Sequence, residues 1–325
     1  MPSIIVHGGA GDYDPDERQE RGVTAAVAAA WNILNAGGTA VDAVEAAIIV
    51  MEDDPIFRAG LGSSLTFEGT VETDASIMQD DFSCGAVAAL TAAVNPIRVA
   101  RLVMDRTDHV MLVGPGADVF ARRMGMEEGD LRTEERLELH ARLRKQFAAG
   151  EDLKFMPRLQ KLSGDMELGT VGAAAIDSDG RIAVGTSTGG MMMKLPGRVG
   201  DSAIIGAGTY ANGFGGASAT GHGEPIIQHV FSKVAVDAIA NVGVREALDM
   251  AIELGRGHGV KFGIIGVEET GAVAPAFSTK AMAWASMVEG KLKTFLSGVV
   301  EAEPDKESDN EPDTEPEDEW PLGPL

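Results

Sequence analysis

The 325-residue sequence contains a single cysteine, Cys84. One thiol excludes an internal disulfide and every metal site that needs two or more cysteines. The six histidines show no metal-ligand spacing. Only two Tyr and three Trp occur, too few to predict an aromatic platform for bases or sugars.

Basic residues and long apolar runs are also scarce. The chain has 27 Lys and Arg against 50 Asp and Glu, a net charge of −23, which argues against nucleic-acid binding because phosphates need a basic surface. No apolar run approaches the ~20 residues of a membrane span, and the N-terminus lacks the pattern of a signal peptide. We therefore expect a cytoplasmic protein with no membrane or nucleic-acid partner. The acidic, lysine-poor composition suits a high-salt cytoplasm, with an ordinary acidic cytosolic protein as the alternative.

Motifs for nucleotides and for serine hydrolases are missing. Residues 206–211 (GAGTYA) formally match a dinucleotide fingerprint, but the Gly-rich residues 212–216 follow where that motif requires a helix. Neither G-x-x-x-x-G-K-[ST] nor G-x-S-x-G occurs. We expect no organic cofactor.

Apolar periodicity predicts sheets covered by helices. This pattern suits an α+β fold, an αββα sandwich formed as one domain by residues 1–295. The expected strands lie at 3–7, 110–113, 171–176, 181–185, 261–267 and 272–276, with strands and turns at 63–78 and 85–93. The expected helices lie at 21–35, 40–51, 96–104, 117–124, 133–147, 225–241 and 244–254.

Two segments depart from this globular pattern. Residues 127–169 are rich in Glu, Arg and Lys and predict a mobile connector with a helical centre at 133–147. Residues 296–325 predict a disordered tail: from Glu301 to Glu319 there are 11 Asp and Glu against one Lys, a net charge of −10.

The connector ends at Gly169-Thr170, where an apolar strand begins. Inside an intact chain Thr170 is an ordinary β-branched residue. If the Gly169–Thr170 bond is cut, the new α-amine, with a pKa near ~8, lies beside the Thr170 hydroxyl and can act as its base. Thr170 is thus a candidate nucleophile.

Residues 177–180 (DSDG) predict a tight turn, so Thr170 begins a hairpin whose second strand ends at 185–190 (GTSTGG). The end of the second strand lies beside the start of the first. Thr188 or Ser187 is therefore expected to reach the Thr170 hydroxyl. The alternative is a polar hairpin exit without a catalytic role.

Two further clusters suit an amino-acid substrate. Arg198 offers a planar fork for a carboxylate and Asp201 an acceptor for an ammonium, and the alternative is a surface salt bridge between them. Thr220 and the Gly221 N–H are candidates for an oxyanion site. His222 follows directly, and we interpret it as a structural residue in preference to a general base.

Residues 168–210, together with 7–11 (HGGAG), 74–78 (DASIM) and 220–224 (TGHGE), closely resemble the plant-type L-asparaginase and isoaspartyl peptidase family of N-terminal-nucleophile hydrolases. The resemblance spans roughly residues 3–295. It implies an αββα sandwich, self-cleavage into residues 1–169 and 170–325, and (αβ)2 homodimers. It also implies a structural sodium ion on backbone carbonyls of Met51, Glu52, Asp54, Phe57, Ala59 and Leu61.

The same resemblance implies the role of each site residue. Thr170 is the nucleophile, and Thr188 forms a hydrogen bond with it. Arg198 binds the substrate α-carboxylate, and Asp201 binds the ammonium with help from the Gly223 carbonyl. The oxyanion is held by Thr220 and Gly221. The expected substrates are L-asparagine and β-aspartyl dipeptides, with no cofactor for catalysis.

One residue departs from the family pattern: Arg58 stands where the family usually has Asn. The expected consequences are altered self-cleavage, a lowered pKa of the base, or a reshaped leaving-group side. Two alternative functions follow. One is a glycosylasparaginase-like amidase, although Gly169 rather than the usual Asp precedes the nucleophile. The other is an uncleaved binding protein whose site Arg58 has altered.

Overall fold

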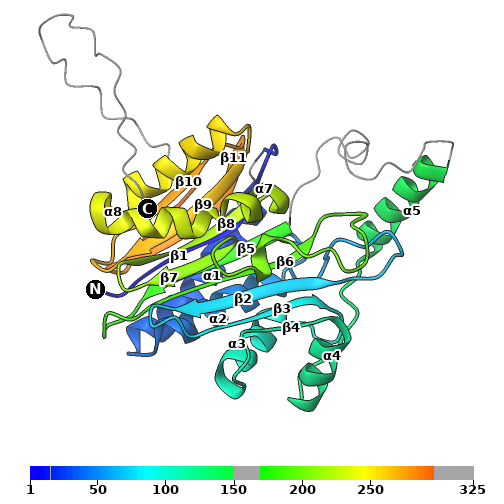
Figure 1. The fold of residues 1–325 in the computed structure, drawn as a ribbon, viewed down its shortest axis with the longest axis horizontal. Helices are drawn as coiled ribbons and strands as arrows, with labels where there is room; N and C mark the ends of the chain where they lie inside the picture. Colours follow the sequence, from blue (N-terminus) through cyan, green and yellow to red (C-terminus); the bar gives the residue numbers. More distant parts are fainter. Residues whose placement is uncertain (15, 149–168, 296–325) are drawn as a thin grey trace, which may run out of the picture.

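The computed structural model describes residues 1–14, 16–148 and 169–295 and contains two stacked sheets (Figure 1). The larger sheet is mostly antiparallel, with one parallel pair at its edge. Its strands are β1 (Ser3–Gly11), β2 (Thr73–Gln79), β3 (Cys84–Leu90), β4 (Met111–Val113), β5 (Gly169–Ile176), β6 (Ile182–Gly190), β11 (Ala281–Val288) and β12 (Lys291–Thr294).

These strands follow the order β12-β11-β1-β5-β6-β2-β3-β4. Strands from both sides of residue 169 thus alternate in one sheet. The smaller sheet is antiparallel, in the order β10-β9-β8-β7. Its members are β7 (Thr209–Asn212), β8 (Gly215–Gly221), β9 (Phe262–Glu268) and β10 (Val273–Phe277).

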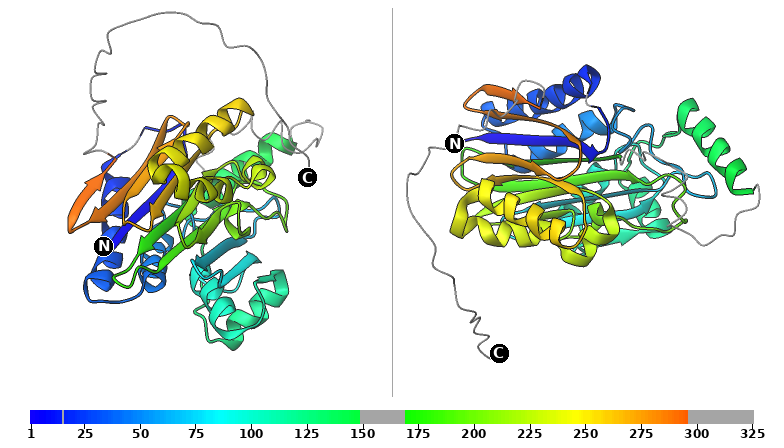
Figure 2. Two further views of the ribbon diagram at one scale, coloured as in Figure 1. Left: turned by 60° about the vertical axis from the view of Figure 1, so that its left-hand side comes forward. Right: turned by 90° about the horizontal axis from the view of Figure 1, so that it is seen from above.

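Helices cover the outer faces of both sheets, which confirms the predicted α+β, αββα architecture (Figure 2). Helices α1 and α2 pack on the larger sheet at β1, β5, β6 and β11, and α3 packs at β2 and β3. Helix α8 packs on the smaller sheet. The helices are α1 (Glu17–Asn35), α2 (Ala40–Glu52), α3 (Pro96–Arg106), α4 (Gly114–Arg123), α5 (Glu134–Ala148), α7 (Gly223–His229) and α8 (Phe231–Gly257), with a 3-10 turn at Asp201–Ala203.

Three buried apolar clusters separate the four layers. One lies between the larger sheet and helices α1, α2 and α3, and another between the smaller sheet and α8. The third, around Ile5, Val184 and Ile265, lies between the two sheets. Because β5 is buried on both faces, its residues 171–176 read as a continuous apolar run rather than an alternating one.

Most predicted elements are present, with shifted ends. Thr39 caps the second helix, since the Asp42 N–H donates to Thr39 Oγ1 at 3.2 Å. The predicted division between helices at 225–241 and 244–254 agrees with the kink at Gly243, but the break at Val230 was not predicted. The chain breaks at Val230, which has a φ of 48°, and α8 then runs through a kink at Gly243, which has a φ of 78°.

Four strands were not predicted: β7, β8, β11 and β12. Strand β8 is rich in Gly and Ala, which have low β propensity. These residues are small because the layers approach closely. A Cβ on Gly216 would lie 2.3 Å from Val184 Cγ2 of the facing sheet.

Part of the predicted connector and all of the predicted tail lie outside the described residues. The helical centre expected at 133–147 is α5. The expectations of mobility at 149–168 and of disorder at 296–325 remain predictions. Among the described helices, none is long and apolar enough to cross a membrane.

Candidate active site

Thr170 lies in β5 with its side chain buried, directly opposite Thr188 of β6. Its hydroxyl donates to Thr188 Oγ1 at 3.1 Å. The register of the two strands shifts between Gly169 and Thr170. Such a bulge leaves a residue out of the regular ladder and re-aims the neighbouring groups. The irregularity therefore coincides with the Gly169–Thr170 bond.

Thr188 uses its full hydrogen-bonding capacity here. Its hydroxyl donates to the Gly169 carbonyl at 2.5 Å and accepts from Thr170 and from the Gly190 N–H, the latter at 2.9 Å. A hydroxyl has one donor and two acceptor positions, so the arrangement is complete. The proton of Thr188 consequently points at the carbonyl of the bond that precedes Thr170.

Ser187, the other residue considered for contact with Thr170, faces the opposite side of the sheet, because successive strand residues alternate. It donates to Glu52 Oε1 at 2.6 Å. Burial raises the pKa of Glu52 to about 8, against the opposing hydrogen bonds from Ser187 and Ile97. The structure thus assigns the contact with Thr170 to Thr188.

Gly169 packs tightly against the backbone of residues 57 and 58. A Cβ there would lie 2.5 Å from Arg58 Cβ and 2.8 Å from the Arg58 carbonyl oxygen. Any side chain at residue 169 would force this backbone apart, which gives a physical reason for glycine before Thr170. Arg58 itself has a φ of 60°, a conformation that is strained for a long side chain.

Arg58 lines a different pocket from Thr170. Together with Arg18 and Arg21 of α1 it lines a charged hollow that also includes Asp54 and Glu135. None of these residues lines the pocket at Thr170. The geometry therefore favours an effect of Arg58 through its backbone beside Gly169 over an effect of its charge on the nucleophile.

Arg198 is ion-paired, but with a residue that sequence reasoning did not assign to the site. Its Nε and Nη2 donate to the two carboxylate oxygens of Glu224 at 2.9 and 2.8 Å. The alternative of a simple Arg198–Asp201 salt bridge was thus wrong. Burial alone raises the pKa of Glu224, but hydrogen bonds from His222 and Arg198 outweigh it and hold this pKa well below its usual range.

Asp201 is buried in the 3-10 turn, and its Oδ2 has no hydrogen-bond partner within the described part of the chain. Burial raises its pKa to about 7, against the opposing effect of Arg198. A Cβ on Gly223 would lie 2.8 Å from Arg198 Nη2 and 3.0 Å from Asp201 Oδ1. Glycine at 223 therefore lets both charged groups lie against the backbone, and the buried, unpaired Oδ2 suits an ammonium ligand.

The predicted oxyanion residues follow at the end of β8. Gly221 has a φ of 155° and lines the pocket. Thr220 is fully buried, and its Oγ1 accepts from the Ala10 N–H at 3.4 Å, but it does not line the pocket. His222 Nε2 lies 3.0 Å from Glu224 Oε2, which supports the structural interpretation of His222.

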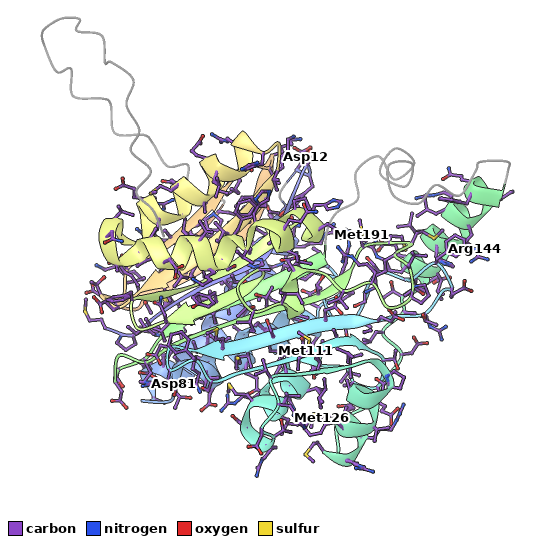
Figure 3. The ribbon with its side chains drawn as sticks, in the orientation of Figure 1. Asp12, Asp81, Met111, Met126, Arg144 and Met191 are labelled. Carbon is purple, nitrogen blue, oxygen red and sulfur yellow. The ribbon has the colours of Figure 1, made fainter. Side chains whose placement is uncertain are left out.

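Most of the predicted site residues thus share one small pocket between β5, β6 and the loop after β6. Figure 3 labels one of its members, Met191, where β6 ends. Thr220 is the only predicted catalytic or substrate-binding residue outside the wall. The lining consists of Thr170, Thr188, Gly190, Met191, Arg198, Gly200, Asp201, Gly221 and Gly223.

Sequence reasoning missed a buried polar network between the two sheets. It starts at His7 Nε2, 3.0 Å from Ser218 Oγ, and continues through hydroxyl groups to Ser76, which donates to the Ser202 carbonyl at 2.6 Å. The intermediate hydroxyls are those of Thr186 and Thr209. Small polar residues inside otherwise apolar strands were the available signal.

Burial lowers the pKa of His7 to about 3, against a small opposing effect of the Thr170 backbone. His7 is therefore neutral at physiological pH and is a poor candidate for a general base. The described residues also contain no group of three or more His, Cys, Asp or Glu side chains arranged to hold a metal ion. A cation in this part of the chain would have to rely on other donors, such as backbone carbonyls.

Known proteins are similar to this chain along most of its length. The family described as Asparaginase matches residues 1–297. A plant-type L-asparaginase of Pyrococcus abyssi is 48% identical over 299 residues, which cover 89% of this chain and 97% of that protein. Isoaspartyl peptidase/L-asparaginases of Bos taurus and Homo sapiens are each 42% identical, over 305 and 301 residues, which cover 90% of this chain and 94% of each relative.

Proposed function

The chain belongs to the asparaginase family, and from this premise we propose that it hydrolyses the side-chain amide of L-asparagine and the isopeptide bond of β-aspartyl dipeptides. The observation that carries the proposal is one pocket lined by both a candidate nucleophile and a pair of charged groups that suit an amino acid. Thr170, hydrogen-bonded to Thr188, provides a hydroxyl nucleophile. Arg198 and Asp201 provide opposite charges for an α-amino acid.

Activation is proposed to be self-cleavage before Thr170. The Thr170 Oγ attacks the Gly169 carbonyl carbon, the C–N bond breaks, the hydroxyl proton passes to the departing Thr170 nitrogen, and an ester replaces the amide. Water then hydrolyses the ester, which releases the Gly169 carboxylate and leaves Thr170 with a free amine. The hydrogen bond from Thr188 to the Gly169 carbonyl supports this route, because a donor on that oxygen stabilises the charge that develops there.

Turnover then uses the new amine as the base. It takes the proton of Thr170 Oγ, which attacks the side-chain carbonyl of the substrate, and the oxyanion is proposed to lie at Thr220 and Gly221. The leaving nitrogen receives the proton and departs as ammonia or an amino acid. Water hydrolyses the β-aspartyl ester and aspartate leaves. Because Arg198 and Asp201 contact only the aspartyl end, the leaving group is left unrestricted.

Product analysis tests this proposal. Purified protein should give two bands on a denaturing gel, the smaller beginning at Thr170, and should release aspartate from L-asparagine and from a β-aspartyl dipeptide. Glycosylated asparagine serves as the competing substrate. A single stable band, or aspartate released only from the glycosylated substrate, would contradict the proposal and favour one of the two alternatives.

Substrate binding should depend on pH through Asp201. Its pKa of about 7 means that the carboxylate is neutral in acid and charged above neutrality. Affinity for an ammonium group therefore falls about tenfold per pH unit below 7 and is constant above it. Calorimetric titration with aspartate between pH 5.5 and 8.5 measures this, with Asp201→Asn as the control. An acid limb that persists in Asp201→Asn would assign the effect to another group.

We further propose a structural sodium ion on the carbonyls of residues 51–61. The donor set fits a hard cation, which prefers oxygen ligands. Two of the six carbonyls, those of Glu52 and Asp54, accept from the N–H groups of Leu61 and Phe57 at 2.7 and 3.1 Å. Each keeps a second lone pair. Met51, Phe57, Ala59 and Leu61 would supply the other carbonyls.

Removal of sodium should lower thermal stability. An ion bound only by the folded state stabilises it by ~2.7 kcal/mol at a concentration 100-fold above its Kd. Melting curves in sodium chloride and in choline chloride at equal ionic strength should therefore diverge, and the difference should grow with the logarithm of sodium concentration. Equal melting temperatures in both salts would contradict the site.

The proposal also covers the oligomeric state and the location of the protein. We propose that the cleaved protomers form an (αβ)2 homodimer, as the family resemblance implies, and that the protein is cytoplasmic, as its single cysteine suits. Light scattering of the cleaved protein measures the first. The mass of a single αβ protomer would contradict it.

A further inference from the structure

Lys194 is a fully buried lysine next to the site that the proposed reaction leaves without a role. Its side chain is 0% exposed. The ammonium Nζ donates to the Glu72 carbonyl at 2.6 Å and to the Gly189 carbonyl at 3.2 Å. Among the described residues, no carboxylate lies within 4 Å of Nζ, although burial lowers the pKa of this group and Asp74 opposes the change at longer range.

An ammonium in such a position is costly to desolvate, and replacing a buried charge by an apolar side chain is often neutral or stabilising. Stability alone therefore gives a weak reason for a lysine here. Of its two carbonyl partners, that of Gly189 belongs to the end of β6.

The Gly189–Gly190 peptide connects Lys194 to the reacting groups. Its carbonyl accepts from Lys194 Nζ, and its N–H donates to Thr188 Oγ1 at 2.9 Å. Gly190 has a φ of 74°, and a Cβ there would lie 2.6 Å from Lys194 Nζ. Glycine thus allows the ammonium to approach this peptide, which forms part of the pocket wall.

The chain of hydrogen bonds has one direction. Lys194 donates to Gly189, Gly190 donates to Thr188, and Thr188 donates to the Gly169 carbonyl at 2.5 Å. A charged donor strengthens the first bond, and successive hydrogen bonds polarise one another. A more polarised Gly190 N–H makes the Thr188 hydroxyl a stronger donor to the carbonyl that Thr170 would attack.

We propose that Lys194 is a positioning residue that acts through the Gly189–Gly190 peptide to hold and polarise the Thr188 hydroxyl, first against the Gly169 carbonyl during self-cleavage and then against the Thr170 hydroxyl during turnover. This inference rests on the proposed function. It involves no covalent step and no proton transfer by Lys194 itself.

Two substitutions test it in the full chain. Lys194→Met keeps the length of the side chain without a charge or a donor, and Lys194→Gln keeps a neutral N–H donor. Self-cleavage should slow by roughly 10- to 100-fold in Lys194→Met and by less in Lys194→Gln. Removing a donor that contacts an oxyanion directly lowers kcat by ~10²- to 10³-fold, and the effect of Lys194 should be smaller because it acts through one peptide. The kcat of the cleaved enzyme should follow the same order. Lys233→Met, at an exposed lysine of α8, is the control and should behave as the wild type.

Two further readouts separate positioning from a purely structural contact. The melting temperature of Lys194→Met should not fall, and KM should stay within about twofold, because Arg198 and Asp201 are unchanged. Wild-type cleavage rates in both variants would overturn the inference. A slower rate that comes with a lower melting temperature or a tenfold rise in KM would also overturn it, in favour of a loop clamp. If the wild type itself does not cleave, the proposed function fails, independently of Lys194.

Discussion

Replacement of Thr170 with Ala should leave one uncleaved polypeptide of 33.9 kDa with turnover reduced by a factor on the order of 10⁶, the loss seen when a hydrolase nucleophile is removed. The hydroxyl is the attacking group in both proposed steps, so its removal blocks the release of the α-amine as well as the attack on substrate. Denaturing gels, intact mass and aspartate release measure both effects.

Thr170→Ser is the matched control because it keeps the hydroxyl and removes one methyl group. It should still cleave, more slowly, since the serine side chain is less restricted at χ1 and is aligned less often with Thr188 Oγ1 at 3.1 Å. Thr170→Ala should melt close to the wild type, because only a hydroxyl and a methyl group are lost. Turnover by an uncleaved Thr170→Ala protein would refute the mechanism.

Arg198→Ala should raise KM by roughly 10²- to 10³-fold with a smaller change in kcat. Truncating one member of a buried, hydrogen-bonded charge pair costs about 2–5 kcal/mol. Here the loss leaves Glu224 without its bidentate partner and removes the fork proposed for the substrate α-carboxylate. Initial rates over a wide range of L-asparagine concentration separate the two constants.

Two variants distinguish substrate binding by Arg198 from its contact with Glu224. Arg198→Lys keeps the charge but not the fork and should lie between the wild type and Arg198→Ala. Glu224→Gln removes the ion pair but leaves the guanidinium in the pocket, so KM should change far less. If Glu224→Gln raised KM as much as Arg198→Ala, the arginine would serve mainly to hold the start of α7.

The contact between Thr170 and Thr188 could be predicted from the sequence of the hairpin. The turn at residues 177–180 sets the hairpin register, since Ile176 pairs with Ile182 and the same step leads outward to Thr170 and Thr188. The turn residues and the strand lengths are local properties. The two candidates were therefore available from the sequence, and the alternation of side chains selected Thr188 over Ser187.

Arg58 and Glu224 illustrate the opposite case. The side-chain direction of Arg58 depends on its positive φ and on the hollow beside α1, neither of which has a pattern in the neighbouring residues. Glu224 lies 26 residues from Arg198 and meets it because the loop after β6 and the start of α7 come together. Pairings of this kind arise from packing between layers.

The sequence by itself determined the layered fold, the hairpin that bears Thr170, and the candidate residues for the nucleophile and for the aspartyl end of a substrate, because turn chemistry, apolar periodicity and short motifs are local. Only the tertiary structure decided that Arg198 pairs with Glu224, that Asp201 keeps a buried, unpaired carboxylate oxygen, and that Lys194 contacts Thr188 through one peptide. These facts depend on how separate segments desolvate one another, and burial is a property of the assembled layers rather than of any one segment.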